Sequence, residues 1–231
     1  MIGTLINAAT VLIGGILGLL FGSRLSERVR QTVVAGLGIF VLGYGLMNFM
    51  GTKNPLIVLG SILIGSLLGE WWKIEDLLQK LAASLETRFS NTDNGSNRFV
   101  LGFLTASILF CVGPMSILGS IQDGLSGNYS ILATKAVLDG FAALAFTSTM
   151  GVGVMFSVIV IVVYQGGISL LAAQLNQVIT APMMTELTAT GGIILVGIAI
   201  SNLLEIKRIR MGNFLPALIV APIIVAILAH F

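Results

Sequence analysis

Long apolar segments alternate with short polar ones along the whole chain of 231 residues. Because about 20 apolar residues in a helix cross a bilayer core about 30 Å thick, these segments predict transmembrane helices. Eight candidates result, at residues 2–22, 32–51, 55–72, 99–121, 131–149, 152–173, 189–204 and 213–231. The predicted fold is therefore an all-α, polytopic membrane protein, with residues 1–231 forming a single integral membrane domain.

The longest polar segment, residues 73–97, predicts an amphipathic helix followed by a flexible linker, "SNTDNGSN". In "KIEDLLQKLAASLETRF" the apolar residues recur at spacings of three and four, as on one face of a helix. These residues are Ile74, Leu77, Leu78, Leu81, Leu85 and Phe89. Such a face predicts a helix that lies at the cytoplasmic membrane surface. Because the charges of the helix nearly cancel, we do not expect it to form a polybasic lipid-binding patch. Trp71 and Trp72 precede it as interfacial anchors.

The composition agrees with a membrane protein and excludes a soluble one. Hydrophobic residues make up 56% of the chain and charged residues 10%, whereas about a quarter of a soluble domain is charged. Apolar segments recur along the whole length, so the first is expected to be a span and not a signal peptide. The one cysteine, Cys111, lies in an apolar run and gives no disulfide framework. We expect the lipid bilayer as partner, and no nucleic acid, cofactor or metal.

The positive charges predict the orientation of the spans. Ten of the twelve Lys and Arg residues fall after the first span, after the third and before the last. They are Arg24, Arg28, Arg30, Lys73, Lys80, Arg88, Arg98, Lys207, Arg208 and Arg210. Such loops stay in the cytoplasm, and even numbers of crossings separate them, so both termini are predicted to be extracytoplasmic. A re-entrant pair formed by the fourth and fifth segments would preserve this parity and stays open.

Spans one to three resemble spans six to eight. "GIFVLGYGLMN" from Gly38 matches "GIILVGIAISN" from Gly192 at two glycines and the final asparagine. Because five crossings separate the copies, they would form an inverted repeat, an architecture of many secondary transporters. Chance alignment of glycine-rich segments is the alternative. Gly14, Gly18 and Gly22 recur every four residues, a spacing that packs helices closely within a chain or in a homodimer.

The fourth span contains its own helix breaker, in "FCVGPMSILGSIQDG" at residues 110–124. Pro114 has no amide proton for the Phe110 carbonyl, and Gly113 is free to leave helical geometry. We therefore predict a broken helix, which a bilayer tolerates only where protein or a water-filled cavity satisfies the freed groups. The alternative is a proline kink relieved by Ser116 or a neighbouring helix.

Charged residues in or near the spans are the other candidates for function, because a charge at a helix centre costs about 2.5 to 3.5 kcal/mol. Lys135 and Asp139, four residues apart in the fifth span, are placed to pair. Asp123 follows the broken helix, where a solvated turn is the alternative, and Glu186 is interpreted as a loop charge before the seventh span. Asn7, Asn48, Gln165 and Asn202 add polar groups inside spans. The candidate solute or ion site comprises Gly113, Pro114, Ser116, Asp123, Lys135, Asp139, Thr147, Ser148 and Thr149.

Several segments carry a resemblance to a known family. "GFLTASILFCVGPMSILGSIQDGLSGNYS", "LATKAVLDGFAALAFTSTMGVGVMFS", "YQGGISLLA" and "RMGNFLPALIVAPII" resemble the YqgA/YdfK-like family of bacterial inner-membrane proteins, a domain of unknown function. The resemblance covers essentially the whole chain. It implies a multi-pass protein of the bacterial plasma membrane and carries no substrate or functional residues with it.

Two functions compete on these observations. The first is a transporter or channel for a small solute or ion, with a cation or proton coupling favoured because Asp123, Asp139 and Glu186 outnumber Lys135 on the predicted outer side. The second is a non-transporting scaffold or accessory subunit. An enzyme is not expected, because His230 is the only histidine and neither H-E-x-x-H, G-x-S-x-G nor a P-loop occurs.

Overall fold

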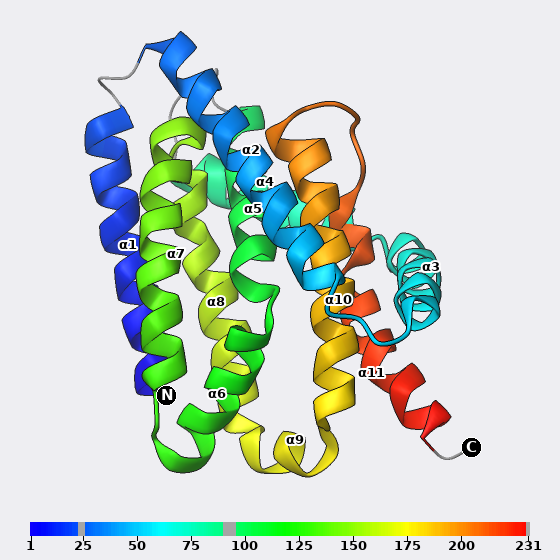
Figure 1. Ribbon diagram of the computed structural model, residues 1–231. Helices are drawn as coiled ribbons and strands as arrows, with labels where there is room; N and C mark the ends of the chain where they lie inside the picture. Colours follow the sequence, from blue (N-terminus) through cyan, green and yellow to red (C-terminus); the bar gives the residue numbers. More distant parts are fainter. Residues whose placement is uncertain (23–25, 90–95, 230–231) are drawn as a thin grey trace. The chain divides into compact units, whose positions relative to one another are not determined.

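The computed structural model describes residues 1–22, 26–89 and 96–229, and these ranges contain helices and no strand (Figure 1). The helices are α1 (Ile2–Gly22), α2 (Glu27–Phe49), α3 (Pro55–Trp72), α4 (Ile74–Phe89), α5 (Ser96–Cys111), α6 (Pro114–Ser126), α7 (Ser130–Met150), α8 (Gly153–Leu170), α9 (Ala172–Val178), α10 (Ala181–Ile198) and α11 (Ala217–Leu228). A π-helical turn, η1 (Ala199–Leu203), continues α10, and a 3-10 turn, η2 (Met211–Phe214), precedes α11. Arg24, linker residues 90–95, His230 and Phe231 lie outside the described residues.

The chain forms two compact units. Unit 1 comprises residues 1–34, 79–111 and 115–177, and so contains α1, α5, α7 and α8 entire, with nearly all of α6 and α9. Unit 2 comprises residues 35–78, 112–114 and 178–231, and contains most of α2, with α3, α10 and α11. The single membrane domain expected from the sequence stays a prediction.

Seven of the described helices are long and apolar enough to cross a membrane, which confirms the predicted class. The seventh predicted span differs from the structure, because α10 with η1 runs from Ala181 to Leu203 and does not begin at residue 189. Thr180 caps this helix by accepting a hydrogen bond from the Met183 amide at 3.5 Å, and Pro182 lies in its first turn. The polar start of the segment is therefore helical, although its low hydropathy places it outside the predicted span. In the same way α2 begins at Glu27, not at residue 32.

Within unit 1, α1 and α7 run side by side in the same direction (Figure 1). Gly18 and Gly22 of α1 lie directly against the α7 backbone: a Cβ at Gly22 would stand 2.6 Å from the carbonyl oxygen of Ser148, and one at Gly18 2.5 Å from that of Leu144. Gly14 faces α7 as well. The predicted glycine stripe therefore packs two helices of one chain. A homodimer stays a prediction, and through this stripe it would have to displace α7.

Helices α5 and α6 form a bent pair that is long and apolar enough for one broken span. The two helices meet at an angle of 62°. Phe99, at the start of α5, lies against Gly153, where α8 begins, and Gly124, near the end of α6, lies against Ser169, near the end of α8. The two ends of the pair thus lie beside the two ends of α8, as expected of one broken span, and the re-entrant alternative stays open. If this pair is one span, the described residues contain eight candidate crossings, as the sequence predicts.

Unit 2 contains two antiparallel helix pairs, α2 with α10 and α3 with α11. Their facing residues run in opposite order along the chain: Gly38 with Leu204 and Gly45 with Gly192 in the first pair, Gly60 with Ile224 and Gly69 with Asn213 in the second. In unit 1, α1 and α8 are likewise antiparallel. An inverted repeat requires opposite directions for these three pairs, and all three meet that condition. The repeat itself stays a prediction.

The predicted amphipathic helix is present as α4, but its acids and leucines are arranged in an unexpected way. Glu75 and Glu86 are buried, whereas Leu77 and Leu81 are 66% and 42% exposed. The Glu75 carboxylate accepts a hydrogen bond from the Gly212 amide at 2.7 Å, which gives that acid a fixed role within unit 2. The exposed leucines suit a helix at a membrane interface, where apolar side chains enter the lipid.

Candidate polar site in unit 1

Lys135 and Asp139 of α7 form the predicted ion pair. Their side chains are only 7% and 11% exposed, and Asp139 lies at the middle of its helix. Asp139 is therefore held inside unit 1 and is not exposed to solvent. One turn of helix separates the two residues, so both charges come from the same element and need no other helix to meet.

Two amide side chains from other helices complete the polar cluster, which we define as Asn7, Lys135, Asp139 and Gln165. The Asn7 Nδ2 group of α1 donates to the Asp139 carboxylate at 3.0 Å and to the Gln165 Oε1 atom of α8 at 3.4 Å. Both amide side chains are fully buried. Asn7 Oδ1 and Gln165 Nε2 have no hydrogen-bond partner among the described residues. The cluster therefore joins three helices and keeps one acceptor and one donor unused.

The orientation of both amides follows from the carboxylate. An ionised carboxylate only accepts hydrogen bonds, so Asn7 must present its NH₂ group to Asp139. The second hydrogen of that NH₂ group is donated to Gln165, which must therefore accept it with its Oε1 atom. Rotating either amide would set two acceptors or two donors against each other. The unused atoms, Asn7 Oδ1 and Gln165 Nε2, are thus fixed by the network.

The predicted break adjoins this cluster through Phe110. Helix α5 ends at Cys111, Gly113 has a φ of +138°, and α6 begins at Pro114. The Ser116 hydroxyl donates to the Phe110 carbonyl at 3.0 Å, so Ser116 satisfies the group that Pro114 leaves without its helical partner. The ammonium of Lys135 lies 5.9 Å from the centre of the Phe110 ring. The structure therefore brings the end of α5 to the ion pair.

The predicted hydroxyl group at the end of α7 lies apart from the cluster. Ser148 and Thr149 both donate to the Ala145 carbonyl of their own helix, at 2.7 and 3.1 Å. The Thr147 hydroxyl is buried and has no hydrogen-bond partner among the described residues. Thr147 is eight residues from Asp139, about 12 Å along a helix. The three hydroxyls are thus not assembled with the ion pair.

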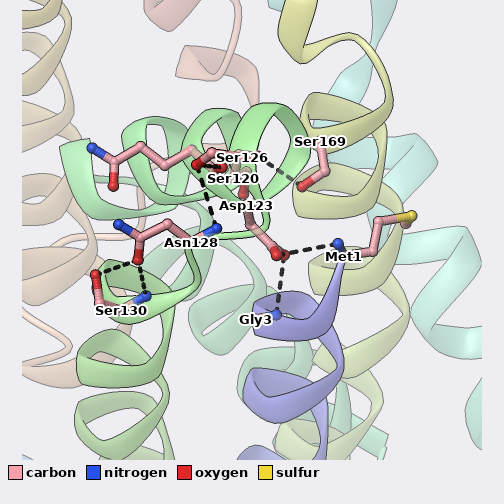
Figure 2. A network of polar contacts seen from close by, with 9 residues as sticks. Met1, Gly3, Ser120, Asp123, Ser126, Asn128, Ser130 and Ser169 are labelled. Atoms are coloured by element: carbon pink, nitrogen blue, oxygen red, sulfur yellow. Dashed lines mark hydrogen bonds and ion pairs between the residues drawn. The ribbon is translucent and has the colours of Figure 1, made fainter.

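Asp123 also lies outside the cluster, at the N-terminal end of α1 (Figure 2). It is buried, not solvated, and its carboxylate accepts a hydrogen bond from the Gly3 amide at 3.0 Å and pairs with the Met1 amino group at 3.2 Å. Beside it, the Ser169 hydroxyl of α8 donates to the Ser120 carbonyl of α6 at 2.9 Å. Asp123 therefore stabilises the positive end of α1 and joins it to α6.

Glu186 is not a loop charge, and that interpretation is wrong. It lies inside α10, where it is 3% exposed. Its carboxylate accepts hydrogen bonds from the Thr52 hydroxyl at 2.5 Å and from the amides of Lys53 and Asn54 at 2.8 and 3.2 Å. Glu186 thus holds the segment before α3. The Thr-Ala-Pro start of α10 is the sequence signal that places it within a helix.

Sequence reasoning does not single out Asn7 and Gln165 from the other amides inside spans. Their partnership with Asp139 depends on contacts between helices far apart in the chain, which no local spacing reveals. Within the described ranges, no group of three or more His, Cys, Asp or Glu side chains is placed to hold a metal ion.

Comparison with known proteins relates the chain to uncharacterised membrane proteins. The model of the family DUF554, described as "Protein of unknown function", matches residues 2–226. "Uncharacterized membrane protein YdfK" of Bacillus subtilis is 29% identical over 235 residues, which cover 100% of this chain and 98% of that protein. "Uncharacterized protein YqgA" of Escherichia coli is 32% identical over 224 residues, covering 96% and 94%. No solved structure matches. With a match that extends over nearly its whole length, this multi-span chain belongs to the DUF554 family of proteins of unknown function.

Proposed function

We propose that this protein moves a small solute or ion across the bacterial plasma membrane, with the polar cluster as its binding site. The observation that carries the proposal is a buried ion pair in a membrane-crossing helix, surrounded by amides whose hydrogen-bonding capacity is not used up. Stability gives no reason for such a pair, because well-packed apolar residues commonly replace a buried ion pair without loss. Charges and buried polar groups inside membrane helices are typical of transport pathways.

The ion pair changes which solutes the proposal favours. Lys135 already neutralises Asp139, so a metal or alkali cation would have to displace an ammonium that is tethered one turn away. A proton does not compete in this way, because protonation of Asp139 removes the charge that holds Lys135. We therefore favour proton coupling through Asp139 over transport of a free cation. The extracytoplasmic termini remain part of the proposal.

The proposal is tested by flux in proteoliposomes. The full chain is reconstituted with a pH-sensitive dye inside, and proton movement is followed when a mixture of small solutes is added outside. We expect solute-dependent proton movement that protein-free liposomes lack. Asp139→Asn should reduce it at least tenfold, whereas Asp76→Asn, a carboxylate of α4 outside the cluster, should leave it unchanged. Equal flux in the wild type and in Asp139→Asn would refute the role of Asp139.

A scaffold or accessory subunit is the second candidate, and α4 favours it. Leu77 and Leu81 are exposed on this helix and are available to a protein partner as well as to lipid. Crosslinking in native membranes followed by purification distinguishes the two functions. A stoichiometric partner that is crosslinked at Leu77, together with an absence of flux from the purified chain, would support the scaffold.

A further inference from the structure

The polar cluster carries no net charge, which limits the class of solute that it suits. Its one cation, Lys135, and its one anion, Asp139, are paired in the interior of unit 1. A solute with a net charge would add an uncompensated charge to a desolvated site, at a cost that grows with burial. A neutral or zwitterionic solute adds none. The cluster therefore favours a solute whose own charges sum to zero.

The hydrogen-bonding groups of the cluster come in matched sets. Two donors are offered, the Lys135 ammonium and the unused Gln165 Nε2 group, and one of them is charged. Two acceptors are offered, the Asp139 carboxylate and the unused Asn7 Oδ1 atom, and again one is charged. A carboxylate is recognised by donors with positive charge, and an ammonium by acceptors with negative charge.

We propose that the solute is a small zwitterion of the α-amino acid class, an inference that rests on the transport function proposed above. Its carboxylate binds Lys135 and Gln165, and its ammonium binds Asp139 and Asn7. On binding, the internal ion pair opens and is replaced by two ion pairs with the solute, while both unused amide atoms gain partners. The number of ion pairs and hydrogen bonds rises, which offsets the free-energy cost of separating Lys135 from Asp139.

Other occupants make fewer of these contacts. Water bound at the unused amide atoms would leave the ion pair closed. A carboxylate without an amine would pair with Lys135 and leave Asp139 without a partner, and an amine without a carboxylate would do the reverse. Glycine betaine has the two charges but no N–H group, so it would leave Asn7 Oδ1 without a donor. These differences make the proposal testable with simple compounds.

The test is equilibrium binding to the purified full chain in detergent. The probes are radiolabelled glycine, L-alanine and L-serine, and the competitors are propionate, ethylamine, potassium chloride and glycine betaine. We expect at least one amino acid to bind, and each competitor to displace it at least tenfold less well than the unlabelled amino acid. Gln165→Leu removes one hydrogen bond to a charged group and should weaken binding about tenfold or more. Gln122→Leu is the matched control, since Gln122 is exposed on α6.

Three results would overturn the inference: no binding of any of the three amino acids to folded protein, equal affinity in Gln165→Leu and wild type, or equal competition by glycine betaine and glycine. Gln165→Leu changes no charge, and its folding is checked by its melting temperature. Flux separates this inference from the transport proposal. Proton flux that depends on Asp139 without amino acid binding refutes the zwitterion and keeps transport. Binding that depends on Gln165 without any flux supports the site and refutes transport.

Discussion

The ion pair of α7 allows a thermodynamic test of whether Lys135 and Asp139 serve stability or function. Asp139→Leu leaves the Lys135 ammonium buried without its partner, and Lys135→Met does the same to the carboxylate. Removing one partner of a buried pair costs about 3 to 5 kcal/mol. In the double variant Lys135→Met, Asp139→Leu neither charge of this pair remains. Two contacts are then lost without replacement: the hydrogen bond from Asn7, worth about 1 kcal/mol, and the contact of the Lys135 ammonium with the Phe110 ring, worth about 0.5 to 1 kcal/mol.

We therefore expect each single variant to lose about 3 kcal/mol or more and the double variant only about 1 to 2 kcal/mol. The free energy of unfolding is measured in mixed micelles by titration with a denaturing detergent, and the four proteins form a double-mutant cycle. A coupling energy of several kcal/mol would confirm a tight buried pair. Single effects that simply add in the double variant would refute it. Flux measured on the same samples should vanish in the folded double variant, because the binding charges are gone.

Other parts of the structure give three further predictions. Gly14→Ala should cost about 1 to 3 kcal/mol of unfolding free energy, because its Cβ would meet the Gly140 carbonyl of α7. Its control, Gly43→Ala, has no neighbour within 4 Å of the new Cβ and should be neutral or slightly stabilising. Equal effects of the two substitutions would contradict the described packing of α1 on α7. Gly113→Ala should cost about 1 to 3 kcal/mol because of its φ of +138°; a stability like that of the wild type would show that the backbone there relaxes. Glu186→Ala removes three hydrogen bonds and should cost about 3 kcal/mol while leaving flux intact, and a loss of flux in folded protein would move Glu186 into the transport pathway.

Local sequence patterns predict much of this fold. Apolar length marks the spans, and the Gly113–Pro114 pair marks the break, because both depend on properties of a single segment. The spacing of Lys135 and Asp139 predicts their pairing for the same reason. The start of α10 is harder to predict from hydropathy, since Glu186 and the threonines around it are polar and yet helical. There the helix-start signal at Thr180 is more informative than hydropathy.

The contacts between helices do not follow from the sequence. Asn7 reaches Asp139 across 132 positions and Gln165 across 158, and nothing in either segment marks the partner. Likewise, three glycines at a spacing of four indicate close packing, but the spacing does not say whether the neighbour is α7 or a second copy. Such contacts depend on how helices rotate about their axes, which only tertiary packing decides.

The glycine seam between α1 and α7 has a mechanical consequence for the proposed site. From Gly14 to Gly22 the backbone of α1 lies against that of α7, with little side-chain volume between them, so we expect these two helices to move together. Asn7 and Asp139 both belong to this helix pair, whereas Gln165 belongs to α8 and Phe110 to α5. The half of the site that contains the Asp139 carboxylate is thus expected to stay in place when the other helices move. A solute would then reach the site through displacement of α8, or of α5 about its break, away from α1 and α7.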